Sequence, residues 1–166
     1  MTTLTPAGVE DRLAVSDVLL RYCSSVDAKD FDTVRGLFVD EATASYGGSD
    51  WIQGADTIVA WLRAMTAEQA YQHHLLSVYH VDLDPSGDEA TAVSYLVSHQ
   101  VGTADPDTVL QLVSRYYDTL RRVDGRWLIT KKEYVIGWAE LRGAPQSLLL
   151  AEPPSIDLPG MSELVG

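Results

Sequence analysis

The residues best suited to acid–base chemistry are the four histidines, and all of them lie between Tyr71 and His99. This stretch is predicted to form two long strands joined by a turn at residues 84–88, with imidazoles near the far ends of the strands. An imidazole changes its charge near neutral pH, which suits it to take up and release protons. We therefore expect proton transfer in a closed pocket, with Asp27 as the partner of one histidine.

Strand geometry limits which histidine can have this role. Successive side chains point to opposite faces of a strand, so only one of His73 and His74 can face the pocket. His80 lies close to the turn, and we interpret it as a structural or surface residue. Asp27 follows an apolar helical pattern, and from there its carboxylate would hold the imidazole in one tautomer and stabilise its charged form.

A metal site is the less favoured interpretation of these residues. His74, His99 and Asp27 could supply three ligands, but the chain has no HxxxH pair on a helix, and Cys23 is its only cysteine. Cys23 falls within the apolar pattern of a helix, which is typical of a buried thiol. We expect neither a metal nor an organic cofactor.

The strand after His99 has a face that is typical of a ligand pocket. Its alternating residues are mainly apolar with a few polar groups among them: Leu110, Leu112, Ser114, Tyr116, Asp118 and Leu120. Taken singly, Ser114 and Tyr116 are better explained as hydrogen-bonded core residues. Taken together, the set indicates a pocket wall that is mostly apolar and carries a few hydrogen-bonding groups.

Helices that precede a sheet must position these residues. Apolar residues recur at helical spacing over 6–27, 31–38 and 55–65. Alternation predicts short strands at 42–46 and 51–54 and long strands at 72–83, 89–100, 109–123 and 127–136. This order predicts an α+β fold, in which helices pack on one face of a curved, mostly antiparallel sheet and leave a cavity open at one end.

The length of 166 residues fits one domain, which we expect over residues 1–136. Residues 137–166 are interrupted by prolines and are predicted to wrap the surface or cover the pocket. The formal net charge of −12 argues against nucleic acid and anionic membranes as partners, because a phosphate-binding surface needs clustered Lys and Arg. Without a signal peptide or a span-length apolar stretch in the sequence, we expect a soluble, cytoplasmic protein.

Several segments resemble the SnoaL-like branch of the NTF2-like superfamily. The resemblance covers residues 9–134 and rests on the segments Asp27-Ala28-Lys29-Asp30-Phe31, Leu37-Phe38, Asp40-Glu41-Ala42, Gln72-His73-His74 and Asp124-Gly125-Arg126-Trp127. It implies a cone-shaped α+β barrel with the pocket inside. Because this fold hosts enzymes and non-enzymes alike, the function must be inferred from the site.

Within that superfamily the chain is similar to the scytalone dehydratase type, and the lindane dehydrochlorinase shares part of the pattern. The resemblance implies that Asp27 orients a histidine base, which matches His73 by local context and His74 by strand length, and we favour His74. It also implies catalytic roles for Tyr46 and for His99, which would assist the leaving group. Ser114 matches a serine of the following strand.

Two departures from the dehydratase pattern put the substrate in doubt. Val26 stands where the family has a tyrosine, and Tyr116 stands where it has an asparagine. We expect Tyr116 or Tyr95 to replace the lost hydroxyl. Substrates of the group are polycyclic, aromatic or terpenoid, so the resemblance also implies pocket walls formed by Trp51, Leu110, Leu112 and Trp138.

The sequence therefore favours a cofactor-independent dehydratase or related lyase that acts on a small hydrophobic carbonyl compound. A cyclase or isomerase with the same base is the alternative, as is a ligand-binding module without catalysis. An epoxide hydrolase is disfavoured because Arg115 falls on the wrong strand face. We expect a homo-oligomer, with a trimer favoured and a dimer as the alternative. An Asp27 carboxylate within hydrogen-bonding reach of His73 or His74 would favour catalysis over simple binding.

Overall fold

The computed structural model describes residues 6–143, which form three helices and six strands. The helices are α1 (Pro6–Asp27), α2 (Phe31–Gly36) and α3 (Ala55–Thr66). The strands are β1 (Phe38–Tyr46), β2 (Ile52–Gln53), β3 (Gln69–Leu83), β4 (Glu89–Gly102), β5 (Thr108–Val123) and β6 (Arg126–Gly143). The helices come first and the antiparallel meander follows, as the sequence predicted.

The long helix α1 ends at a sharp change of direction that places Asp27 at its last position. Its apolar face is buried against the sheet through Val15, Leu19, Tyr22, Cys23 and Val26. Lys29 then adopts a positive φ of 56°, a conformation that turns the chain out of the helix. The carboxylate of Asp30 caps α2 by accepting a hydrogen bond from the backbone N–H of Thr33 at 3.1 Å.

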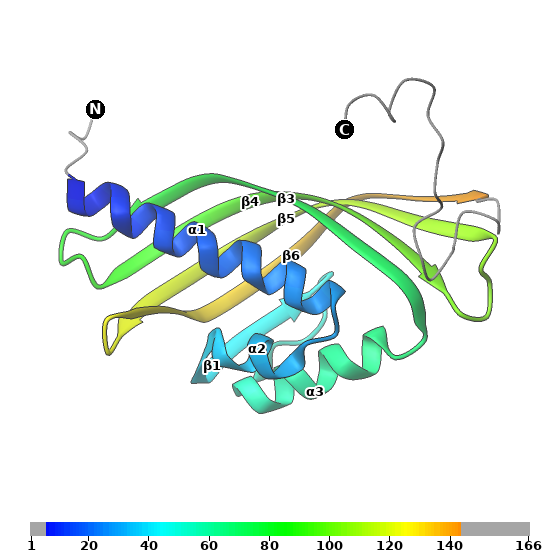
Figure 1. Ribbon diagram of the computed structural model, residues 1–166, viewed down its shortest axis with the longest axis horizontal. Coiled ribbons are helices and arrows are strands. Elements are labelled where there is room, and N and C mark those ends of the chain that lie inside the picture. The colour runs from blue at the N-terminus through cyan, green and yellow to red at the C-terminus, as the bar shows by residue number, and fades with distance from the viewer. Residues whose placement is uncertain (1–5, 144–166) are drawn as a thin grey trace, which may run out of the picture.

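The six strands form one sheet in the order β2-β1-β6-β5-β4-β3. β1 runs parallel to β6, and every other neighbouring pair is antiparallel. Figure 1 shows the long strands curving around α1, with all three helices on one side of the sheet. The α+β fold is confirmed, but β2 and β3 remain edge strands, so the sheet is curved and open rather than a closed barrel.

The last strand is longer than its sequence pattern indicated. We predicted residues 127–136, but β6 continues to Gly143, which pairs with Thr108 of β5. A register shift opposite Val113 and Ser114 leaves Gly137 unpaired, and past this bulge the strand pairs with the start of β5. Residues 137–143 therefore extend the sheet, and the remainder of the predicted covering segment lies outside the described residues.

The two faces of the sheet differ in character. The inner face packs against the helices and contributes Ala92, Leu96, Leu120 and Ile129 to the core. The outer face carries exposed large side chains, namely Tyr71, Leu75, Tyr79, Tyr95, Val113, Tyr117, Val135 and Trp138. Among the described helices, none is long and apolar enough to cross a membrane.

Candidate active site

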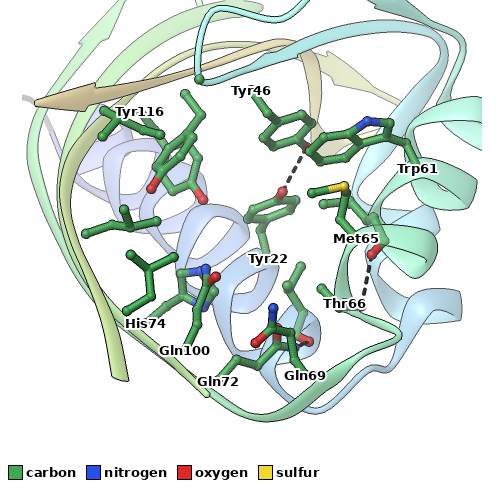
Figure 2. Close-up of a pocket in the computed structure, with 17 residues that line it drawn as sticks. Tyr22, Tyr46, Trp61, Met65, Thr66, Gln69, Gln72, His74, Gln100 and Tyr116 are labelled. Carbon is green, nitrogen blue, oxygen red and sulfur yellow. Dashed lines mark hydrogen bonds between the residues drawn. The ribbon is translucent and has the colours of Figure 1, made fainter. Parts of the chain in front are cut away.

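A cavity of about 340 Å³ lies between α1, α3 and the inner face of the sheet. Aromatic and aliphatic side chains form most of its lining, including Tyr22, Tyr46, Trp61, Leu112, Tyr116, Tyr134 and Ile136. His74 and the amides of Gln69, Gln72 and Gln100 add polar groups (Figure 2). An apolar cavity with a few polar groups is the usual form of a small-molecule site.

Asp27 and His74 meet at the wall of this cavity. The imidazole Nδ1 of His74 forms a hydrogen bond with Oδ1 of Asp27, and the backbone N–H of His74 donates to Oδ2 at 2.9 Å. Because a carboxylate accepts hydrogen bonds, the proton of the neutral ring resides on Nδ1 and the Nε2 lone pair remains available. The side chains are 10% and 21% exposed for His74 and Asp27, so the contact is largely shielded from solvent.

Two further contacts hold the end of α1 against the start of β3. The side-chain amide of Gln72, which is buried, donates to the carbonyl oxygen of Val26. The ammonium of Lys29 donates to the carbonyl oxygen of Gln69 at 2.9 Å. Since Gln72 and His74 are two residues apart on one strand, they share a face and approach α1 together. These contacts involve Val26 before Asp27 and Lys29 after it, so they fix the position of Asp27 relative to the imidazole.

His73 and His99 lie outside the cavity, contrary to the prediction that His99 assists there. They are direct cross-strand partners on the outer face of β3 and β4, where the His73 ring stacks on Tyr71 with centroids 6.4 Å apart. The register explains this placement, because His74 pairs with Ser98, so residue 99 must face the other way. The residue next to it, Gln100, lines the cavity instead.

Three residues predicted to bind substrate are also absent from the cavity lining: Trp51 and Trp138, expected as walls, and Tyr95, expected to supply a hydroxyl. Tyr95 and Trp138 lie on the outer face, Tyr95 beneath the guanidinium of Arg115 and Trp138 opposite Val113. Trp51 precedes β2, is 41% exposed, and is covered by the ammonium of Lys131 at 4.6 Å from its ring centroid. Leu110, Leu112 and Tyr116 do line the cavity, as the alternation of β5 predicted.

Four tyrosines form a cluster at one side of the cavity, which we call the tyrosine layer: Tyr22, Tyr46, Tyr116 and Tyr134. Tyr46, Tyr134 and Tyr116 are cross-strand neighbours on β1, β6 and β5, and Tyr22 reaches them from α1. The hydroxyls of Tyr22 and Tyr46 are hydrogen-bonded at 2.8 Å (Figure 2). Ser114 does not line the cavity, but its hydroxyl lies 2.7 Å from that of Tyr134 and holds it in place.

The tyrosine hydroxyls are suited to donate hydrogen bonds. Burial raises the pKa of Tyr22, Tyr46 and Tyr116 above the ordinary phenol value, because the charged form would lose its solvation. Burial also raises the pKa of Tyr134, an effect that its hydrogen bond to Ser114 opposes. All four therefore stay protonated at neutral pH and can stabilise negative charge that develops on a bound oxygen.

Sequence reasoning missed Tyr22, Trp61, Gln72 and Gln100. Tyr22 had a usable signal, since it precedes Val26 by four residues and must share its helix face. Gln72 follows from alternation once His74 is placed inward, whereas Gln100 follows only when the register that pairs Gln72 with Gln100 is known. Trp61 stacks on Tyr46 with ring centroids 4.5 Å apart and an interplanar angle of 10°, a tertiary contact that no local pattern indicates.

The residues together do not form a metal site. Within residues 6–143 there is no group of three or more His, Cys, Asp or Glu side chains placed to hold a metal ion. Asp27 and His74 meet, but the third ligand considered from the sequence, His99, faces away from them. What the arrangement can do is remove a proton with His74 and stabilise an oxyanion with tyrosine hydroxyls.

Comparison with known proteins agrees with the fold. The chain belongs to the SnoaL-like domain family, whose model matches residues 7–133. An uncharacterised protein of Mycobacterium tuberculosis is 27% identical over 130 residues, which cover 78% of this chain and 87% of that protein.

Two solved structures share the same architecture. A candidate scytalone dehydratase from Novosphingobium aromaticivorans superimposes with a TM-score of 0.75 at 21% identity, over 85% of this chain and 95% of that one. A hexachlorocyclohexane dehydrochlorinase, LinA type 2, does so with a TM-score of 0.75 at 14% identity, over 90% and 98%. At these identities the likeness establishes the fold, and the chemistry must be inferred from the site.

Proposed function

We propose that this protein is a cofactor-independent lyase that dehydrates a small hydrophobic carbonyl compound, with His74 as general base. The observation that carries the proposal is the Asp27–His74 hydrogen bond at the wall of an apolar cavity. A ligand-binding module would need the cavity but would have no use for a carboxylate that fixes the imidazole tautomer. Dehydratases and dehydrochlorinases among the structural neighbours are consistent with this class of reaction.

The first step is removal of a proton from the carbon next to the substrate carbonyl. Nε2 of His74 takes the proton, the C–H electrons move toward the carbonyl oxygen, and an enolate forms. Asp27 stabilises the imidazolium. Of the hydrogen-bonded hydroxyls of Tyr22 and Tyr46, one donates to the other, and the second donates a hydrogen bond to the enolate oxygen. A carbonyl already acidifies its neighbouring C–H bond, so the step requires no metal or organic cofactor.

The second step uses the same imidazole. His74 is the single histidine in the cavity lining formed by the described residues. The imidazolium therefore returns its proton to the departing hydroxyl, the C–O bond breaks, and water leaves as the carbon–carbon double bond forms. If the imidazolium instead returns the proton to another carbon, the same residues catalyse an isomerisation, which is why a cyclase or isomerase remains the second candidate.

The test is turnover of β-hydroxy ketones and phenolic polycycles by wild type and four variants. Asp27→Asn and His74→Ala should each lower kcat by about 10²- to 10⁴-fold, the usual contribution of a positioned general base. His73→Ala and His99→Ala are matched controls, because they remove the same side chain from the outer face and should keep full activity. Equal activity in wild type and His74→Ala, or loss in His73→Ala alone, would refute the assignment of the base.

A further inference from the structure

A fully buried ion pair, distinct from the Asp27–His74 contact, lies beside the tyrosine layer. Nζ of Lys132 is 2.8 Å from Oδ1 of Asp118, and their side chains are 1% and 0% exposed. The residues are direct cross-strand partners on β6 and β5. Oδ2 of Asp118 has no hydrogen-bond partner in the described part of the chain. Two apolar side chains of similar volume often stabilise a protein core as much as a buried ion pair does, so stability alone does not explain this pair.

The ammonium of Lys132 is enclosed by two tyrosine rings as well as by the carboxylate. Nζ lies 3.9 Å from the ring centroid of Tyr116 and 4.2 Å from that of Tyr22. Ring faces attract cations most strongly when water is excluded, and both rings are buried. This arrangement directs the ammonium toward the tyrosine layer rather than toward solvent.

The register places the pair directly behind the layer. Along β5 and β6, Asp118 and Lys132 are each two residues from Tyr116 and Tyr134, so all four side chains share the inner face. Tyr22, Tyr116 and Tyr134 line the cavity, whereas the ion pair does not. Of the two charges in the pair, the ammonium is the one in contact with the ring faces of Tyr22 and Tyr116. It lowers the energy of negative charge placed at the hydroxyls of the layer, whereas the carboxylate of Asp118 opposes this effect by raising the pKa of Tyr46 and Tyr116. Because the ammonium contacts the rings directly, we expect its effect to be the larger one.

We propose that Lys132, held by Asp118, is a positioning residue that polarises the tyrosine layer, so that the cavity binds the anionic form of a phenol or enol in preference to its neutral form. The inference rests on the proposed function, because the proposed reaction forms an enolate and the polarised tyrosine layer would stabilise this anion. Its ligand class is an acidic, enolisable or phenolic molecule of a size that fits the cavity. Binding at equilibrium tests it without turnover.

The probe is 4-nitrophenol, which ionises near neutral pH. Its phenolate form absorbs visible light strongly and its neutral form only weakly, so absorbance reports the ratio of the two. Wild type should bind it and raise its ratio of phenolate to phenol by about tenfold, which corresponds to a pKa lowered by about one unit in the bound ligand. The variant is Lys132→Met with Asp118→Leu, which removes both charges and leaves the net charge unchanged. In this variant the bound ratio should return toward that of the free ligand.

Two further variants separate this effect from simpler causes. Lys131→Met removes a neighbouring lysine that is exposed and should leave the ratio unchanged. Tyr46→Phe removes a hydroxyl of the layer and should lower the ratio, because the charge acts through these donors. Circular dichroism and thermal melting verify that each variant folds.

Three results would overturn the inference: no binding of 4-nitrophenol to wild type, binding without preference for the phenolate, or an unchanged preference in the double variant. Because no turnover is measured, a phenolate preference that depends on Lys132 stands even if every candidate substrate fails. The converse result is turnover that depends on His74 and a double variant that keeps the phenolate preference of wild type. This result would refute the role of Lys132 and leave the proposed lyase function standing.

Discussion

Removing Lys132 alone should destabilise the protein in a way that depends on pH. In Lys132→Met the carboxylate of Asp118 stays in the core without its cation, and breaking a buried pair in this manner costs about 3–5 kcal/mol of unfolding free energy. Burial already raises the pKa of Asp118, and Lys132 is the group that opposes this rise. Its removal therefore raises the folded-state pKa of Asp118 further, while the pKa in the unfolded chain stays ordinary.

The sign of the pH effect follows from this difference. A carboxyl with a raised folded-state pKa binds its proton more tightly in the folded state, so folding is favoured at low pH and the advantage is lost as the pH rises through the folded pKa. The variant should thus lose most stability at neutral pH and recover part of it in mild acid, where Asp118 is protonated and neutral.

Urea unfolding at neutral and mildly acidic pH measures both quantities. The double variant with Asp118→Leu supplies the control, because it leaves no buried charge and should unfold within about 1–2 kcal/mol of wild type at neutral pH. An equal loss of stability for the single variant at both pH values would refute the reasoning, and so would a double variant as unstable as the single one.

Three other predictions follow from the site and the sheet. Activity should persist on the alkaline side, because burial raises the pKa of Tyr46 and keeps its hydroxyl protonated; a pH–rate profile checks this limb. Gln72→Leu should lower kcat more than KM and cost about 1 kcal/mol in thermal melting, because the bond to Val26 that positions Asp27 is lost. A homo-oligomer, trimer or dimer, should be found by light scattering, and Leu75→Glu on the outer face should dissociate it if a second copy covers that face.

The order of elements and the contact between α1 and β3 could be predicted because they depend on local patterns. Helical spacing placed the end of α1 at Asp27, and alternation offered one inward choice between His73 and His74. The same rule, applied from Leu112 across to β4, would have put Ser98 inward and His99 outward. The role of His99 was inferred from its place in a segment that resembles the family. The side chain faces outward because the pairing register between β4 and β5 decides the face of the sheet on which it lies.

Other features of the site depend on contacts that no local pattern contains. The stack of Trp61 on Tyr46 requires α3 to cross the end of β1, and its position is set by packing rather than by spacing. The outward placement of Trp138 depends on the bulge at Gly137, a one-residue insertion that changes which face the following residues occupy. Aromatic composition alone therefore could not distinguish wall residues of the cavity from residues of the outer face.

The hydrogen bonds from Asp27 to both the ring and the backbone of His74 join residues 47 positions apart in the chain. Such a contact forms only after the ends of the intervening chain segment, from α1 to β3, have come together, and this closure has an entropic cost in folding. The base therefore acquires its fixed tautomer only when the tertiary structure is assembled. Partly folded chains would carry an imidazole but no oriented base, so recovery of activity during refolding should lag behind recovery of helix and report completion of the native fold.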